Sequence, residues 1–233
     1  MRLYAMDAGC VQNFARLAQS SSRRWFEMIG DDPLNIIITG VGGQGNVVAS
    51  RIIASAAVNE GLYVSVGEIY GASQRGGAVT SYVRLSGEMQ YGPIIPRGMA
   101  HIIIGFEPIE SLRAIGNFGS KKTRAIINPR PIYPVDVLSG TLEYPPVEEV
   151  LKAIKELVYG VQVIEATELA KKAGDAVMQN IVMVGCVVGS GLIPIEIETT
   201  KEIIKESFAK ERVEANLKAF KSGVGEIKGR KAV

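Results

Sequence analysis

Cysteine and histidine are scarce in this chain, and their scarcity limits the metal chemistry that the chain can support. The 233 residues include two cysteines, Cys10 and Cys186, and one histidine, His101. An iron–sulfur cluster held by four thiolates cannot be built from two cysteines, and a zinc site would need further ligands. We therefore expect no conventional metal centre on this chain alone. His101 lies in the apolar run 99–104, where we expect a strand residue with a satisfied ring rather than a catalytic base.

Long apolar runs and blocks of like charge are also missing. No stretch reaches the roughly 18 apolar residues of a membrane span, and residues 1–7 lack the charged-then-apolar order of a signal peptide. The 26 basic and 24 acidic residues leave a net charge of +2, without a basic tract. These absences predict no nucleic-acid partner and no membrane partner. Two cysteines in no disulfide pattern suit a reducing compartment, so we expect a cytoplasmic protein.

Length and composition are those of one globular domain with extensions. Hydrophobic residues make up 47% and charged residues 21%, which is ordinary for a chain that buries a substantial core. Residues 1–34 read as a poorly packed N-terminal extension with a polar break at 20–24, or as an upstream start with Met28 as the true initiator; the alternative is a helical arm that binds a partner. Regular patterns begin afterwards, so we place the main domain at 35–225 and a C-terminal tail at 226–233.

The main domain opens with a strand, a glycine turn, a helix and a second strand. The β-branched run 35–39 is followed by Gly40-Val41-Gly42-Gly43-Gln44-Gly45, and small and aliphatic residues then recur through 46–60. Residues 63–66 predict the second strand. This Rossmann-like order predicts a right-handed βαβ unit with the two strands in a parallel sheet.

The rest of the chain alternates between strand and helix patterns. Residues 67–77 read as a loop, and 78–85 alternate like a strand that returns as an antiparallel hairpin through 89–95. We predict further strands at 101–105, 124–128 and 161–164, and a proline-rich surface crossing at 129–146. Helices are predicted at 107–116, 147–158, 166–189 and 199–221. The third should break near Gly174, and the last should open with a capping box formed by Thr199 and Glu202. The predicted fold class is α/β, with three α/β/α layers around a mixed, mostly parallel sheet.

The glycine turn admits more than one interpretation. Glycines at 40, 42 and 45 match GxGxxG, and the free N–H groups of a helix start attract anions, which favours a dinucleotide. The acid that would bind the ribose should end the second strand, about 20 residues on, whereas the candidate here, Glu68, lies in the predicted loop. No lysine follows the last glycine, so the turn is no P-loop. The pattern also resembles the nucleotide loop of adenylating enzymes, and simple packing of the helix on the sheet would explain it too.

The loop after the second strand concentrates glycine and hydrogen-bonding groups. Its segment Ser73-Gln74-Arg75-Gly76-Gly77 offers a hydroxyl, an amide and a fixed cation beside two glycines that permit close approach. This loop should share the carboxyl edge of the sheet with the glycine turn, where open α/β sheets bind ligands. We therefore predict a functional surface at 40–45 and 68–77.

Together these segments resemble the gamma domain of the pyruvate and 2-ketoacid ferredoxin oxidoreductases. The similarity covers about residues 34–222 and includes the segments 66–68, 105–113, 128–132, 180–185 and 213–220. Within the family, Ser73-Gln74-Arg75 and Phe106-Glu107-Pro108 resemble the small (beta) subunit of the indolepyruvate branch. The leader departs from the family pattern, in which the first strand comes almost at once.

The resemblance implies a subunit that is inactive alone. Its complex would oxidatively decarboxylate indolepyruvate and other arylpyruvates to aryl-acetyl-CoA, CO2 and reduced ferredoxin. Thiamine diphosphate, Mg²⁺ and 4Fe–4S clusters would lie on a larger partner subunit, in a heterodimer or a dimer of heterodimers, with coenzyme A as co-substrate. The chain would complete the active-site cleft. The alternatives are a stand-alone dinucleotide-binding oxidoreductase and an adenylating or binding module.

Candidate binding residues follow from the two motifs, and no catalytic residue is assigned. We expect the glycine turn to contact phosphate, the second segment to contact ligand or partner, and Glu68 to orient that segment through Arg75. The cofactor-binding candidates are Gly40, Gly42, Gly43, Gln44, Gly45, Glu68, Ser73, Gln74, Arg75, Gly76 and Gly77.

Overall fold

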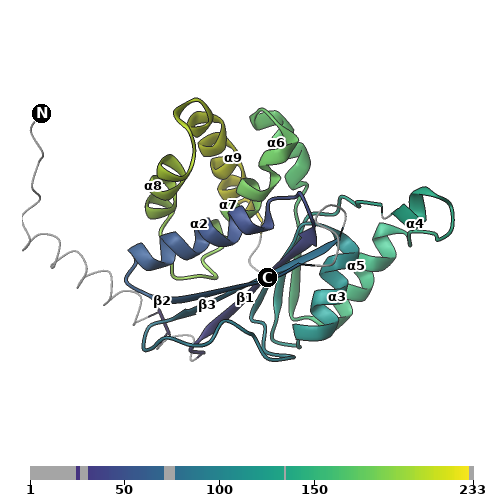
Figure 1. Cartoon of the computed structure of the whole chain (residues 1–233), viewed down its shortest axis with the longest axis horizontal. Helices are drawn as coiled ribbons and strands as arrows, with labels where there is room; N and C mark the ends of the chain where they lie inside the picture. Colours follow the sequence, from purple (N-terminus) through teal and green to yellow (C-terminus); the bar gives the residue numbers. More distant parts are fainter. Residues whose placement is uncertain (1–24, 27–30, 71–76, 134, 231–233) are drawn as a thin grey trace, which may run out of the picture.

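The fold is a six-stranded sheet with helices on both faces (Figure 1). The computed structural model describes residues 25–26, 31–70, 77–133 and 135–230. The strands are β1 (Leu34–Val41), β2 (Tyr63–Tyr70), β3 (Ala78–Ser86), β4 (Ile102–Gly105), β5 (Arg124–Ile127) and β6 (Gly160–Val163). The helices are α2 (Asn46–Asn59), α3 (Pro108–Phe118), α4 (Val135–Leu138), α5 (Val147–Leu157), α6 (Ala166–Ala173), the 3₁₀ turn η1 (Ala176–Met178), α7 (Gln179–Gly189), α8 (Ile197–Ser207) and α9 (Lys210–Lys228).

The sheet is mixed, with the strand order β2-β3-β1-β4-β5-β6. Strands β1, β4, β5 and β6 pair in parallel, whereas β3 is antiparallel to both of its neighbours, β1 and β2. Strand β2 therefore runs in the same direction as β1, and β3 alone is reversed among the described strands. The predicted three-layer α/β/α fold with a mixed, mostly parallel sheet is confirmed.

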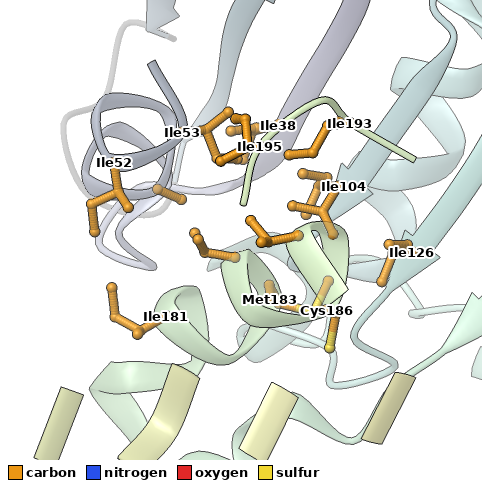
Figure 2. Close-up of a cluster of buried hydrophobic side chains, with 14 of the residues drawn as sticks. Ile38, Ile52, Ile53, Ile104, Ile126, Ile181, Met183, Cys186, Ile193 and Ile195 are labelled. Carbon is orange, nitrogen blue, oxygen red and sulfur yellow. The ribbon is translucent and has the colours of Figure 1, made fainter. Parts of the chain in front are cut away.

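Each face of the sheet carries its own hydrophobic core. Because successive side chains of a strand point to opposite faces, Ile38 of β1 packs under α2, α6, α7, α8 and α9, while Ile37 packs under α3 and α5. Figure 2 shows the first core, where Ile38 and Ile104 of the strands meet Ile53 of α2 and Met183 of α7. Strand β1 is buried along its whole length, as expected of a strand covered on both faces.

Helices α7 and α9 pack backbone against backbone behind the sheet. A Cβ on Gly223 would lie 2.0 Å from the carbonyl oxygen of Val182, and one on Gly185 would lie 2.2 Å from that of Phe220. Only glycine permits this approach. Cys186 lies in the same layer, and burial raises the pKa of its thiol to about 12, so the thiol is a packing group rather than a nucleophile.

The predicted hairpin of β3 with residues 89–95 is wrong. Strands β1 and β2 run in the same direction on either side of α2, as the predicted βαβ order requires, but β3 lies between them in the sheet. The hairpin partner of β3 is β2, which extends through Tyr70 into the predicted loop, because residues 68–70 pair with 79–81. Residues 89–95 form no strand, and Pro93 among them lacks the N–H that a sheet ladder needs.

The helix predictions held except at one position. The break near Gly174 is confirmed, since α6 ends at Ala173 and α7 begins at Gln179. The helix predicted at 199–221 is instead two helices, α8 and α9, separated by an extended Phe208 that packs against the core. Helix α8 begins at Ile197, so the predicted capping box at Thr199 is wrong.

His101 has the satisfied ring that its sequence context predicts. It lies immediately before β4, and its Nδ1 accepts a hydrogen bond from the backbone N–H of Asn35 at 2.8 Å. Burial lowers the pKa of this ring, while Asp31 at 3.9 Å raises it by a smaller amount. The neutral ring is thus part of the junction between β1 and β4, at the amino edge of the sheet.

Described residues upstream of β1 contact the first core. The Phe26 side chain is only 6% exposed and belongs to the cluster that α2 covers, and Trp25 packs beside it. The two rings meet edge-to-face with their centroids 5.2 Å apart. The packed body therefore extends upstream of β1.

Candidate functional site

The carboxyl ends of β1 and β4 form a topological switch point. From β1 the chain passes to α2 on one face of the sheet, and from β4 it passes to α3 on the other face. Ligands of open α/β sheets bind in the crevice that such a divergence creates. The glycine turn follows β1, and Phe106 and Glu107 follow β4, so both segments lie at this crevice.

The glycines of the turn have different roles. Gly43 and Gly45 have φ angles of 101° and 84°, in the left-handed region that favours glycine. A Cβ on Gly45 would lie 2.4 Å from Nδ2 of Asn180, whereas one on Gly43 would meet no described atom within 4 Å. Gly45 thus lets α7 approach, and Gly43 faces open space. Glycine at the N-cap position, Gly45, has no side chain to accept from the first N–H groups of α2, which suits these groups to an anion.

Gln44 faces inward and closes the crevice from below. It is only 4% exposed. Its Oε1 accepts from the backbone N–H of Val41 at 2.7 Å, and its Nε2 donates to the carbonyl oxygen of Phe106 at 2.8 Å. A Cβ on Gly40 would lie 2.6 Å from this Oε1, which explains the glycine there. The Gln44 amide therefore joins the end of β1 to the end of β4, and its polar groups are engaged by the backbone.

The glycine turn and the β2–β3 hairpin meet at this edge. The N–H of Gly42 donates to the carbonyl oxygen of Gly77 at 2.8 Å, and Nδ2 of Asn46 donates to that of Val79 at 3.0 Å. The structure thus brings together residues 40–45 and the start of β3, where the hairpin turns from β2. Ser73, Gln74, Arg75 and Gly76 lie outside the described residues.

Glu68 does not occupy the position of a ribose-binding acid. It lies on β2 opposite Ser81, and β3 separates β2 from the glycine turn of β1. Its carboxylate accepts a hydrogen bond from the Tyr70 hydroxyl, and this bond is the main reason why the pKa of Tyr70 is raised. The dinucleotide arrangement, with an acid at the end of the neighbouring strand, is therefore not formed by Glu68.

Asn128, at the end of β5, provides a buried amide to which the sequence alone assigned no role. Asn128 is fully buried, and its Nδ2 donates to Oγ1 of Thr167 at 3.0 Å and to Oε1 of Gln179 at 3.1 Å. Its Oδ1 has no partner among the described residues. This network ties β5 to α6 and α7 beside the crevice. Its position directly after a buried strand was the signal available in the sequence.

Glu107 supports the α3 side of the same edge. Its side chain is 1% exposed, and Oε2 accepts from the N–H of Glu110 at 2.8 Å, which caps α3. Its Oε1 accepts from the Tyr144 hydroxyl, and burial together with this carboxylate raises the pKa of Tyr144. A cavity of about 200 Å³ lies beside this pair, between α3 and the segment 137–145.

The described part of the chain holds no group of three or more His, Cys, Asp or Glu side chains that could bind a metal ion. None of its helices is both long and apolar enough to cross a membrane. What the edge does offer is backbone N–H groups and exposed glycine on a rigid support. Such an arrangement suits contact with an anionic ligand.

Comparison with known proteins identifies the family. Residues 35–226 match the family model described as pyruvate ferredoxin/flavodoxin oxidoreductase. The chain belongs to this family. The indolepyruvate oxidoreductase subunit IorB of Archaeoglobus fulgidus is 41% identical over 198 residues, which cover 84% of this chain and 97% of the relative. The family resemblance predicted from the glycine motifs is thus confirmed.

Solved structures share the fold. The gamma subunit of a keto/oxoacid ferredoxin oxidoreductase from Geobacter sulfurreducens superposes with a TM-score of 0.62 at 21% identity, over 84% of this chain and 99% of that chain. The 2-oxoglutarate:ferredoxin oxidoreductase from Magnetococcus marinus, solved with 2-oxoglutarate, coenzyme A and succinyl-CoA bound, gives a TM-score of 0.68 at 23% identity. That match covers 87% of this chain but 32% of the other, so the same fold also occurs within a longer chain.

Proposed function

We propose that this chain is the small subunit of a 2-oxoacid:ferredoxin oxidoreductase of the indolepyruvate type. The observation that carries the proposal is the 41% identity to an indolepyruvate oxidoreductase subunit over nearly its whole length. The complex would convert indolepyruvate and other arylpyruvates to aryl-acetyl-CoA and CO2 and pass electrons to ferredoxin. We also propose that it works in the cytoplasm.

The redox cofactors belong to a larger partner subunit in this proposal. Thiamine diphosphate with Mg²⁺ supplies carbanion chemistry, and 4Fe–4S clusters carry electrons. Four cluster thiolates exceed the two cysteines of this chain, and Cys186 is buried with a raised thiol pKa. The role left for the chain is to bind and position.

We assign the glycine turn 40–45 and the start of α2, together called the glycine edge, to the active-site cleft. Gly42 and Gly43 present backbone to the crevice, and the uncapped start of α2 favours the phosphates of coenzyme A. Gln44 holds the two sides of the crevice at a fixed spacing through Val41 and Phe106. Bound coenzyme A in a solved relative of the same fold supports this choice of ligand.

A stand-alone dinucleotide enzyme fits the geometry less well. In that fold the strand beside β1 carries the acid that binds the ribose. Here the neighbour on that side is the antiparallel β3, and the nearest candidate acid, Glu68, is bonded to Tyr70 one strand further out. The GxGxxG pattern therefore marks a Rossmann-like turn without the second half of the dinucleotide site.

Substitution of Arg75 tests whether the glycine edge binds coenzyme A. In the complex with the larger subunit, Arg75→Ala should raise the KM for coenzyme A at least tenfold, because an arginine is always charged and attracts phosphate, and Arg75 precedes by two residues the Gly77 that is bonded to the glycine turn. The matched control is Arg97→Ala, an exposed arginine that precedes β4 at the opposite edge of the sheet. Turnover and KM that stay at wild-type values in Arg75→Ala would remove this role.

A further inference from the structure

The segment that carries α4 projects from the domain. Residues 135–146, here called the α4 arm, comprise α4 and the chain that leads to α5, and Figure 1 shows α4 standing out beyond α3 and α5. Among the side chains that the structure describes in the arm, Leu138 is 71% and Leu142 is 60% exposed. Apolar side chains gathered on a projecting segment are typical of a protein–protein contact.

The base of the arm is fixed to the domain. The Tyr144 hydroxyl donates to the buried carboxylate of Glu107, which itself caps α3. The rings of Tyr144 and Tyr133 meet edge-to-face with their centroids 5.3 Å apart. Anchoring at Tyr144, two residues from Leu142, holds the arm beside α3 and reduces the cost of ordering it on binding.

A pocket lies between the arm and α3, and it is both apolar and acidic. Its volume is about 200 Å³, and its walls include Ile109, Ile132 and Leu142. Three carboxylates line it, those of Glu107, Glu110 and Glu143, against one described cation, Arg113, which pairs with Glu110 at 2.6 Å. Burial is the main cause that raises the pKa of Glu110, so a second cation here would be favourable.

The size and charge of the pocket favour a cationic side chain over a small molecule or coenzyme A. Its volume is below the roughly 300–1,000 Å³ of small-molecule sites, and its carboxylates would repel the phosphates of coenzyme A. A single cationic side chain with a long apolar stem suits it, since the stem can contact the apolar walls while the head meets the carboxylates.

We propose that the α4 arm and this pocket dock the larger partner subunit, and that an Arg or Lys side chain of that subunit, flanked by apolar residues, enters the pocket. The proposal rests on the proposed function for the existence of that subunit. Val41, which also lines the pocket, belongs to the glycine turn. A partner held here would therefore lie against the glycine edge and could close the cleft over it.

The test is the affinity between the separately purified full-length subunits, measured by titration at low and at high salt. The double variant Leu138→Ser/Leu142→Ser should weaken association at least tenfold. Glu143→Lys should weaken it by a similar factor, and this loss should shrink as salt screens the charges. The control Val58→Ser/Ile94→Ser removes side chains that are 57% and 73% exposed elsewhere on the domain, and it should bind like wild type.

Wild-type affinity for both arm variants would overturn the proposal. It would also be overturned if the arm variants altered only self-association of this chain, because the occupant would then be a second copy. Unchanged melting temperatures of the isolated variants show that folding is not the cause of a loss. Because affinity is measured without turnover, a wild-type complex that forms but lacks arylpyruvate activity would contradict the proposed function and leave the docking result standing.

Discussion

Replacement of Gln44 should cost more stability than replacement of any exposed glutamine, because its amide is the link between β1 and β4. Gln44→Met keeps nearly the same side-chain volume but removes both hydrogen bonds, those to Val41 and to Phe106. The backbone N–H of Val41 and the carbonyl of Phe106 are then left in a buried crevice. The carbonyl retains a longer contact, 3.4 Å from Nδ2 of Asn128, so the N–H suffers most.

The expected loss follows from the cost of unpaired buried groups. Each such group costs about 1–3 kcal/mol, and the partial rescue of the Phe106 carbonyl places the total at about 2–4 kcal/mol. This is a large share of the roughly 5–15 kcal/mol that separates folded from unfolded domains. Gln44→Ala should lose more, because it adds a cavity under the glycine turn.

Denaturant unfolding of the isolated chain measures this loss. Gln90→Ala is the matched control, since Gln90 also makes two side-chain hydrogen bonds, to Val64 and Ser65, but is exposed. The control should stay within about 0.5 kcal/mol of wild type. Equal stabilities of Gln44→Met and Gln90→Ala would show that the crevice is open to water and that Gln44 does not set its spacing.

Two further outcomes are expected. Gly223→Ala should destabilise the chain by about 3 kcal/mol or more, because its Cβ would meet Val182 at 2.0 Å, whereas Gly225→Ala in the same helix meets nothing described and should be neutral or stabilising by about 0.5–1 kcal/mol in the same unfolding assay. His101 has a folded-state pKa below its ordinary 6.5. Its stabilising contribution to the free energy of unfolding should therefore be complete above about pH 6.5 and should be lost as the pH falls below that value. The difference in unfolding free energy between wild type and His101→Asn should therefore shrink on acidification, and a constant difference from pH 7.5 to about 5 would contradict the assigned neutral ring.

The first part of the fold was predictable because its signals are local. Strand β1 is a continuous β-branched run, the glycine turn needs left-handed backbone at Gly43 and Gly45, and α2 follows as a helix of small and aliphatic residues. These features depend on neighbours in the sequence. The shared edge of residues 40–45 with the hairpin end at Gly77 also follows from strand direction.

The pairing of β3 was not predictable in the same way. Residues 67–70 contain glycine and a charged side chain, which reads as loop, but they pair with 79–82 as a ladder. The competing segment 89–95 also contains apolar residues, and its Gly92-Pro93 pair argues against a strand. Strand order is decided by such long-range pairing, so the sequence alone favoured the wrong neighbour.

The interior of the site was hidden for a related reason. Gln44 reads as a ligand-facing amide within a glycine loop, yet its partner at Phe106 lies 62 residues away. Asn128 and Glu107 likewise have partners on distant elements, at Gln179 and Tyr144. Residue type predicted polar chemistry at this edge, but it could not predict which side chains support the crevice and which face the ligand.

Reconstitution of the two-subunit enzyme tests the proposed function most directly. We expect the isolated chain to be colourless and inactive, and the larger thiamine diphosphate and iron–sulfur subunit to need it for coenzyme A-dependent reduction of a dye by arylpyruvates. Mixing should restore that activity in proportion to complex formed. An isolated chain that carries a bound dinucleotide and turns over alone, or a stable complex that does not oxidise arylpyruvates, would contradict the assignment.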